Sequence, residues 1–120
     1  MRQRDGKQCD DLKGRCAVEA TLGVIGGRWK AAVLFQLASG TQRFGQLRKL
    51  LPNITQRMLT LQLRELEQDG LVRRTVYAEV PPRVEYDLTA WGESLRPIID
   101  AMSEWGQRYR RRLDGKAKAG

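Results

Sequence analysis

The stretch that most constrains the fold is residues 53–70, which read N-I-T-Q-R-M-L-T-L-Q-L-R-E-L-E-Q-D-G. Thr55 is of a type that caps a helix N-terminus, and Gly70 is of the type that ends a helix in the left-handed conformation. Three leucines between them recur at the spacing of a core-facing stripe: Leu59, Leu63 and Leu66. This spacing predicts one amphipathic helix with a buried leucine face.

The other face of this predicted helix carries cations, amides, hydroxyls and one leucine. Its members are Arg57, Thr60, Leu61, Arg64 and Gln68. Thr55 and Gln56, at the N-terminal end of the helix, are candidate site residues together with Arg57, Thr60, Leu61 and Arg64. A solvated face would mix both charge signs, but here the acids begin only at Glu65. Two interpretations stand side by side. The segment is a surface amphipathic helix, or it is a DNA-recognition helix whose N-terminal half meets base edges and phosphates.

The distribution of charge favours DNA. The 120 residues include 22 Lys and Arg against 14 Asp and Glu, for a formal net charge of +8. No acidic residue occurs between Glu19 and Glu65, whereas seven basic residues do: Arg28, Lys30, Arg43, Arg48, Lys49, Arg57 and Arg64. A segment of one charge sign that ends on a recognition helix is the expected footprint of phosphate binding. Arg48 and Lys49 are predicted to contact phosphates.

Several classes of protein are disfavoured by composition. The chain has no histidine and only two cysteines, Cys9 and Cys16. A zinc site would lack its usual ligands and a nucleophile its usual base, so we expect no enzyme activity, no metal and no cofactor. No apolar run of membrane-spanning length and no secretory signal occurs, which predicts a cytoplasmic protein without a membrane partner.

The residues before the recognition helix predict a helix-turn-helix. Residues 1–15 are polar and predict a mobile arm. Two stripes at helical spacing follow and are predicted to be core: Val18, Leu22, Ile25 and Trp29, then Trp29, Val33 and Leu37. Residues 41–44 could form a brief strand. A short helix with an apolar face at Phe44, Leu47, Leu50 and Leu51 ends at Pro52, where a tight turn leads into the longer helix.

After Gly70 the hydrophobic period changes from 3.6 to 2. Residues 71–77 and 83–88 predict two strands, joined by a connection with two prolines. A hairpin directly after a recognition helix is the wing of a winged-helix domain. Arg73, Arg74 and Arg83 are then candidates for contacts with phosphates or the minor groove, or they are ordinary solvent-side strand positions; both interpretations stay open.

The C-terminal segment predicts a helix with a heptad seam. Its apolar positions are Trp91, Leu95, Ile98, Met102, Trp105 and Tyr109. Thr89 is the expected cap, and Pro97 is expected to kink or restart the helix. Because the seam exceeds what a small core can cover, Ile98, Met102, Trp105 and Tyr109 are predicted to pair with a second subunit. The folded domain is predicted at 16–112, followed by a basic disordered tail at 113–120.

Taken together, these motifs resemble the HxlR family of bacterial winged-helix transcriptional regulators, relatives of the MarR group. The resemblance rests on C-A-V-E-A-T-L-G-V-I-G-G-R-W-K at 16–30, R-F-G-Q-L-R at 43–48, the segment 54–72, Y-A-E-V-P-P-R-V-E-Y-D-L-T at 77–89 and G-E-S-L-R-P at 92–97. It covers about residues 16–106. Ala17 stands where the family usually has proline, and Gly45 where it usually has a polar residue.

The resemblance implies an α+β fold: a mainly helical winged helix-turn-helix domain with a two- or three-stranded wing and a C-terminal dimerisation helix. It implies a homodimeric repressor or activator of transcription on a pseudo-palindromic operator in double-stranded DNA. Some family members sense oxidants or electrophiles through a cysteine at the position of Cys16, which is otherwise a small packing residue at a helix start. The alternative function is a protein-interaction module whose basic face binds an acidic protein. The inducer and the operator stay open.

Overall fold

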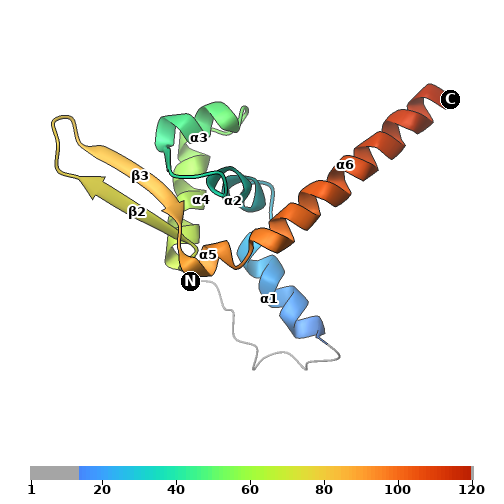
Figure 1. Cartoon of the computed structure of the whole chain (residues 1–120), viewed down its shortest axis with the longest axis horizontal. Coiled ribbons are helices and arrows are strands. Elements are labelled where there is room, and N and C mark those ends of the chain that lie inside the picture. The colour runs from blue at the N-terminus through green and yellow to red at the C-terminus, as the bar shows by residue number, and fades with distance from the viewer. Residues whose placement is uncertain (1–13, 120) are drawn as a thin grey trace.

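The computed structural model of this chain describes residues 14–119. The elements are α1 (Arg15–Ile25), α2 (Lys30–Leu37), β1 (Gln42–Arg43), α3 (Phe44–Leu50), α4 (Gln56–Gln68), β2 (Val72–Tyr77), β3 (Arg83–Leu88), α5 (Ala90–Glu93) and α6 (Arg96–Ala119). The β2–β3 hairpin projects to one side, α1 and α6 project to the other, and α2, α3 and α4 lie between them (Figure 1). The predicted α+β winged helix-turn-helix fold is confirmed, with three strands.

The ends of α4 are set by local chemistry, as the sequence predicts. The Thr55 hydroxyl oxygen accepts a hydrogen bond from the Met58 backbone N–H at 3.0 Å. At the other end Gly70 has φ 78°, and its N–H donates to the Glu67 carbonyl oxygen at 3.0 Å. The next N–H, of Leu71, donates to the Leu66 carbonyl oxygen at 3.0 Å. A left-handed glycine with these two bonds is the Schellman motif, which turns the chain sharply toward the hairpin.

The core is built on the leucine face of α4. Leu59, Leu63 and Leu66 are all buried, which confirms the predicted stripe. They belong to one cluster with residues of α2, α3 and the hairpin: Val33, Leu34, Leu37, Leu47, Leu71, Val72 and Tyr86. Each fully buried leucine stabilises the fold by about 1.5–3 kcal/mol, so this stripe determines how α4 sits on the domain.

The sheet is antiparallel with strand order β1-β3-β2, and it includes the short strand predicted at 41–44. Arg74 lies opposite Tyr86, whereas Arg73 lies opposite Asp87. Because side chains alternate along a strand, these neighbouring arginines point to opposite faces of the hairpin. One face, with Val72 and Tyr86, covers the core, and the other faces away from it.

A close contact joins the hairpin to α5. The Thr89 backbone N–H donates to the Leu71 carbonyl oxygen at 3.0 Å, and the Thr89 hydroxyl donates to the Gly70 carbonyl oxygen at 2.6 Å. Gly92 is buried there, and a Cβ atom at this position would overlap the Leu71 carbonyl oxygen. The turn after α4 and the start of α5 therefore hold each other in place.

The prediction that the first apolar stripe is core is wrong for two residues. Val18 is 60% exposed and Leu22 is 58% exposed, whereas Ile25 is buried. The reason is geometric: α1 leaves the body of the domain, so nothing in the same chain covers its outer turns (Figure 1). Leu50, which the sequence assigns to the apolar face of the short helix α3, is exposed.

The C-terminal segment restarts near Pro97, as the sequence predicts. Thr89, the expected cap, caps only the short α5, through a bond from the Gly92 N–H to its hydroxyl oxygen at 3.0 Å, and the chain restarts as α6 with Pro97 in its first turn. α6 then continues to Ala119, through most of the predicted disordered tail at 113–120. Arginine, lysine, leucine and alanine are good helix formers, and an existing helix extends without a new nucleus. No helix within residues 14–119 meets the length and apolarity that a membrane crossing requires.

An ion pair between a buried lysine of α2 and a half-buried glutamate of α4 joins the two helices. The Lys30 ammonium lies 2.6 Å from a Glu65 carboxylate oxygen, and Lys30 is only 5% exposed. The sequence placed Lys30 among the phosphate-binding cations, and this is wrong, because its charge faces α4 within the domain. Glu65, the first acid after the long basic segment, is its partner.

We predict that Glu65→Ala lowers the free energy of unfolding by about 2–3 kcal/mol, because it leaves a buried ammonium without this carboxylate. Glu67→Ala, at an exposed position one half-turn further along α4, is the matched control and should change stability by less than about 0.5 kcal/mol. Urea denaturation followed by circular dichroism gives both values. Equal effects from the two substitutions would show that the Lys30–Glu65 pair does not stabilise the domain.

Candidate nucleic-acid interface

The outer face of α4 gathers every candidate residue that the sequence assigned to this helix. A shallow hollow over its N-terminal half is lined by Met58 together with the six candidates: Thr55, Gln56, Arg57, Thr60, Leu61 and Arg64. All of these candidates are exposed except Thr60, which is half-buried. Because the opposite face of α4 is fixed in the core, this face is presented to solvent in one orientation.

The polar groups on this face differ in how freely they can bind a ligand. The Thr60 hydroxyl donates to the Gln56 carbonyl oxygen at 2.9 Å, and the Thr55 hydroxyl oxygen is occupied by the cap. Arg57 and Arg64 take part in none of the ion pairs between residues 14 and 119. The two guanidinium groups are therefore the strongest available donors on the outer face of α4.

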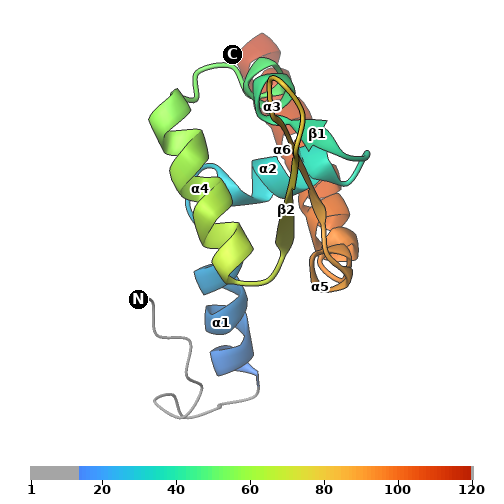
Figure 2. The ribbon, with the colours of Figure 1, turned by 90° about the vertical axis from the view of Figure 1, so that its left-hand side faces the viewer.

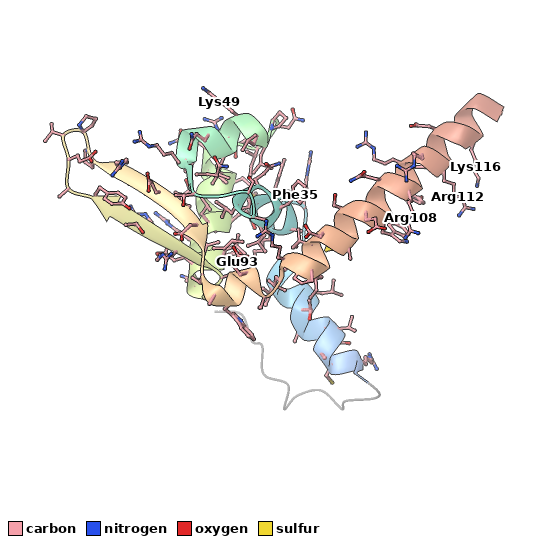
Figure 3. All side chains as sticks on the ribbon, viewed as in Figure 1. Phe35, Lys49, Glu93, Arg108, Arg112 and Lys116 are labelled. Carbon is pink, nitrogen blue, oxygen red and sulfur yellow. The ribbon has the colours of Figure 1, made fainter. Side chains whose placement is uncertain are left out.

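Two further cations lie on α3, the first helix of the helix-turn-helix. Arg48 and Lys49 occupy its last turn, and both are exposed. Lys49 projects from α3 into solvent (Figure 3). The turn that follows contains Asn53 with φ 81°, a conformation that asparagine tolerates better than most residues. Cations at a helix C-terminus are also favoured by the helix dipole.

Two of the three arginines predicted to be contacts on the wing, Arg73 and Arg83, form ion pairs within the hairpin. The Arg73 guanidinium forms two hydrogen bonds to Asp87, with Nε at 3.2 Å from Oδ1. These hydrogen bonds, and the carboxylate charge, raise the pKa of Arg73. Arg83 lies 3.5 Å from Glu79 and 3.7 Å from Glu85, and its guanidinium stacks 4.1 Å from the centre of the Tyr77 ring.

These pairings could not be read from the sequence, because they depend on the register of the hairpin. Asp87 lies fourteen positions after Arg73 and meets it only when the two strands align. Arg74, on the other face, has no carboxylate within salt-bridge distance among the described residues. The structure thus separates Arg74 from the two arginines that share its hairpin.

The predicted dimerisation residues lie along one exposed side of α6. Ile98, Met102, Trp105 and Tyr109 are between 42% and 58% exposed. The rings of Trp105 and Tyr109 stack with centres 5.2 Å apart and planes 11° from parallel. Ile99, by contrast, is buried in the core. One side of α6 therefore anchors the helix, while the heptad side has no cover within the described part of this chain.

The predicted sensor residue lies at the start of α1. Cys16 is the second residue of that helix, is half-buried, and is disulfide-bonded. Cys9, the other cysteine of the chain, and Lys13, which was expected to favour the thiolate, lie outside the described residues. The neighbouring Arg15 is paired with Glu19, at 3.2 Å.

Comparison with known proteins agrees with this arrangement. Residues 24–114 match the family model described as HxlR-like helix-turn-helix. The HTH-type transcriptional regulator YdeP of Bacillus subtilis (strain 168) is 56% identical over 105 residues, which cover 88% of this chain and 81% of that protein.

Solved structures of similar sequence share the fold. The redox regulator HypR in its oxidised form is 56% identical, has a TM-score of 0.75, and is matched over 78% of this chain and 96% of HypR. Its reduced form is 54% identical, with a TM-score of 0.78 over 82% and 98% of the two chains. A transcriptional regulator of the MarR family from Enterococcus faecalis V583 is 40% identical, with a TM-score of 0.73 over 84% and 92%.

The relatives are transcriptional regulators rather than enzymes, and they share both the helix-turn-helix and the wing. The chain belongs to the HxlR-like helix-turn-helix family of transcriptional regulators.

Proposed function

We propose that this transcriptional regulator binds a specific sequence in double-stranded DNA by placing the outer face of α4 in the major groove. The observation that carries the proposal is the contrast between the two faces of α4. One face is fixed by three buried leucines, and the other presents Arg57 and Arg64 without carboxylate partners among the described residues. A rigid helix with free guanidinium groups at its exposed face suits the recognition of guanine edges and phosphates.

Leu61 adds an apolar group to an otherwise polar face and is exposed. An apolar side chain at the centre of a major-groove helix can contact the methyl group of thymine. Arg48 and Lys49 on α3 would then contact phosphates at the edge of the groove. Under this proposal Arg57 and Leu61 contribute to sequence preference, whereas the α3 cations contribute affinity for any duplex.

The regulator acts as a homodimer in this proposal. The uncovered side of α6 and the exposed Val18 and Leu22 of α1 are apolar surfaces on the two helices that leave the domain on the side opposite the hairpin (Figure 1). Contiguous exposed apolar surface on a soluble domain marks an interaction site. A second copy with the same two helices would cover it and would place two copies of α4 about 34 Å apart, one turn of duplex.

A second candidate function is control of DNA binding by thiol oxidation at Cys16. HypR, whose name describes it as a redox regulator, has been solved in oxidised and reduced forms and resembles this chain in both. Cys16 lies at the start of α1, whose exposed apolar side belongs to the proposed dimer surface. A bond formed at this sulfur would therefore act on a helix that sets the spacing of the two α4 helices. The packing role of Cys16 is the alternative.

The competing function, a module that binds an acidic protein, predicts different behaviour in solution. Binding to DNA should weaken steeply with salt and should favour a pseudo-palindromic duplex over a shuffled one. An acidic protein partner would show no such preference among duplexes. Selection of bound sequences from random duplexes by the purified protein distinguishes the two and supplies the operator for the measurements below.

We predict that Arg57→Ala weakens binding to the selected operator by about 1–3 kcal/mol and relaxes the base preference at one position of each half-site. Fluorescence anisotropy on the operator and its single-base variants measures both effects. Arg96→Ala is the matched control, because Arg96 is an exposed arginine at the start of α6 that pairs with Glu93 at 3.4 Å. Full operator affinity in Arg57→Ala would remove α4 from the role of recognition helix.

We predict that Met102→Asp combined with Trp105→Asp gives a monomer that keeps its fold but binds the operator weakly, because two charges on the uncovered side of α6 prevent its burial. Analytical ultracentrifugation at micromolar concentration gives the association state, and circular dichroism checks the fold. Gln107→Asp, at an exposed position on the far side of α6, should leave the dimer intact. A monomeric wild-type protein would rule out the proposed dimer.

We predict that diamide weakens operator binding by the reduced wild-type protein and that dithiothreitol restores it, whereas Cys16→Ser is insensitive to both. The reason is that a disulfide at Cys16 acts on α1 next to the proposed dimer surface. Cys9→Ser, treated in the same way, reports whether the second thiol is needed. Equal responses from wild type and Cys16→Ser would assign Cys16 to packing alone.

A further inference from the structure

A second binding feature lies between α4 and the hairpin, away from the centre of the recognition face. The two elements are in contact, and they diverge from the turn that joins them (Figure 2). Between them is a cleft of about 330 Å³. Its lining comes from four residues of α4 and two of the sheet: Thr60, Leu63, Arg64, Glu67, Arg74 and Tyr86.

The cleft brings together two arginines from different elements. Arg64 reaches it from α4 and Arg74 from β2, and neither has a carboxylate within salt-bridge distance among residues 14–119. Arg74 is free because it lies opposite Tyr86 in the strand register, whereas Arg73 lies opposite Asp87 and is bound to it. Because side chains alternate between the two faces of β2, Arg74 is available to bind a ligand in the cleft and Arg73 is not.

The walls of the cleft are held in place by the core. Leu63 and Tyr86 are both buried, so the backbone positions that carry Arg64 and Arg74 are fixed by packing. Two guanidinium groups that converge on one space favour an oxyanion, because each presents N–H donors in a planar fork. One carboxylate, that of Glu67, also lines the cleft and opposes this charge.

We infer that this cleft binds one backbone phosphate of the DNA, held between Arg64 and Arg74. The inference rests on the proposed function and assigns two roles within it. Arg64, which the sequence placed among the contacts of the recognition helix, supplies affinity for any duplex rather than base preference. Arg74, rather than Arg73 or Arg83, is the residue of the hairpin that binds phosphate.

The charges that line the cleft predict how each substitution in it should change phosphate binding. With both arginines present, two positive charges face one carboxylate; with either arginine removed, the cleft is neutral. Removal of one arginine should therefore abolish most of the phosphate contact, and removal of the second should add little. Removal of the Glu67 charge should have the opposite effect and strengthen binding.

The test uses the full-length protein and two duplexes, the operator selected from random sequences and a shuffled duplex of the same composition. Arg74→Ala is expected to weaken binding about three- to tenfold on both duplexes, with the ratio of the two affinities unchanged. The slope of log affinity against log salt should fall in magnitude by about 0.9, the contribution of one phosphate. Arg73→Ala, the neighbouring arginine on the opposite face, is expected to match wild type in both measurements.

Arg64→Ala should reproduce Arg74→Ala, the double variant should lose little more than either one, and Glu67→Gln should bind both duplexes more tightly. Thermal unfolding of each variant verifies that the fold is kept. Wild-type binding and slope in Arg74→Ala would overturn the inference, and so would a loss of preference for the operator in Arg64→Ala. Both results leave the proposed function standing if wild type still prefers the operator. A wild-type protein that binds neither duplex overturns both.

Discussion

Burial of the leucine face of α4 is the constraint on which the rest of the domain depends. Leu59, Leu63 and Leu66 pack against α2, α3 and the hairpin, and a chain of this size has one core to offer them. Since a helix buried along one stripe cannot rotate, its other face is presented in a single orientation. The Thr55 cap and the left-handed Gly70 set the two ends of α4, so they also set the length of its outer face. The surface proposed to read DNA is thus a consequence of core packing.

The carboxylates around α4 pair with cations away from its outer face, so the arginines on that face keep no carboxylate partner among the described residues. Glu65 pairs with the buried Lys30 at the side of α4 that faces α2. One acid is therefore absent from the outer face of α4, and one cation is absent from the surface. On the hairpin, Asp87, Glu79 and Glu85 neutralise the arginines that face away from α4. Arg57, Arg64 and Arg74 are left without carboxylate partners within the described residues, and all three are exposed. The net charge of +8 does not show this distribution, in which these arginines lie on α4 and on the face of the hairpin next to it.

The two helices that leave the domain have a different character. α6 extends away from the body and carries Arg108, Arg112 and Lys116 at intervals of one turn on its outer half (Figure 3). Its inner half carries the exposed apolar residues Ile98, Met102 and Trp105, and α1 adds Val18 and Leu22. The polar outer face of α4 and the apolar surfaces of α1 and α6 thus belong to different parts of the molecule, and the core joins them. In the proposed dimer, a change in how these apolar helices pair would move whole domains as rigid bodies.

The elements that depend on residues close together in the chain could be predicted from the sequence. The cap and end of α4, its leucine stripe, the hairpin after Gly70 and the break before Pro97 all follow from residue type and spacing, and the structure has them there. Helical periodicity also places Arg57, Leu61 and Arg64 together on the side of α4 away from the leucines, and all three are exposed there. Tertiary structure decided what depends on partners distant in the chain. Lys30 is buried because Glu65 lies beside it, Arg73 is bound because the strand register brings Asp87 opposite, and Arg74 is free because Tyr86 occupies the corresponding place. Val18 and Leu22 have the periodicity of core residues, but which surfaces cover a periodic stripe is settled only when the helices are packed.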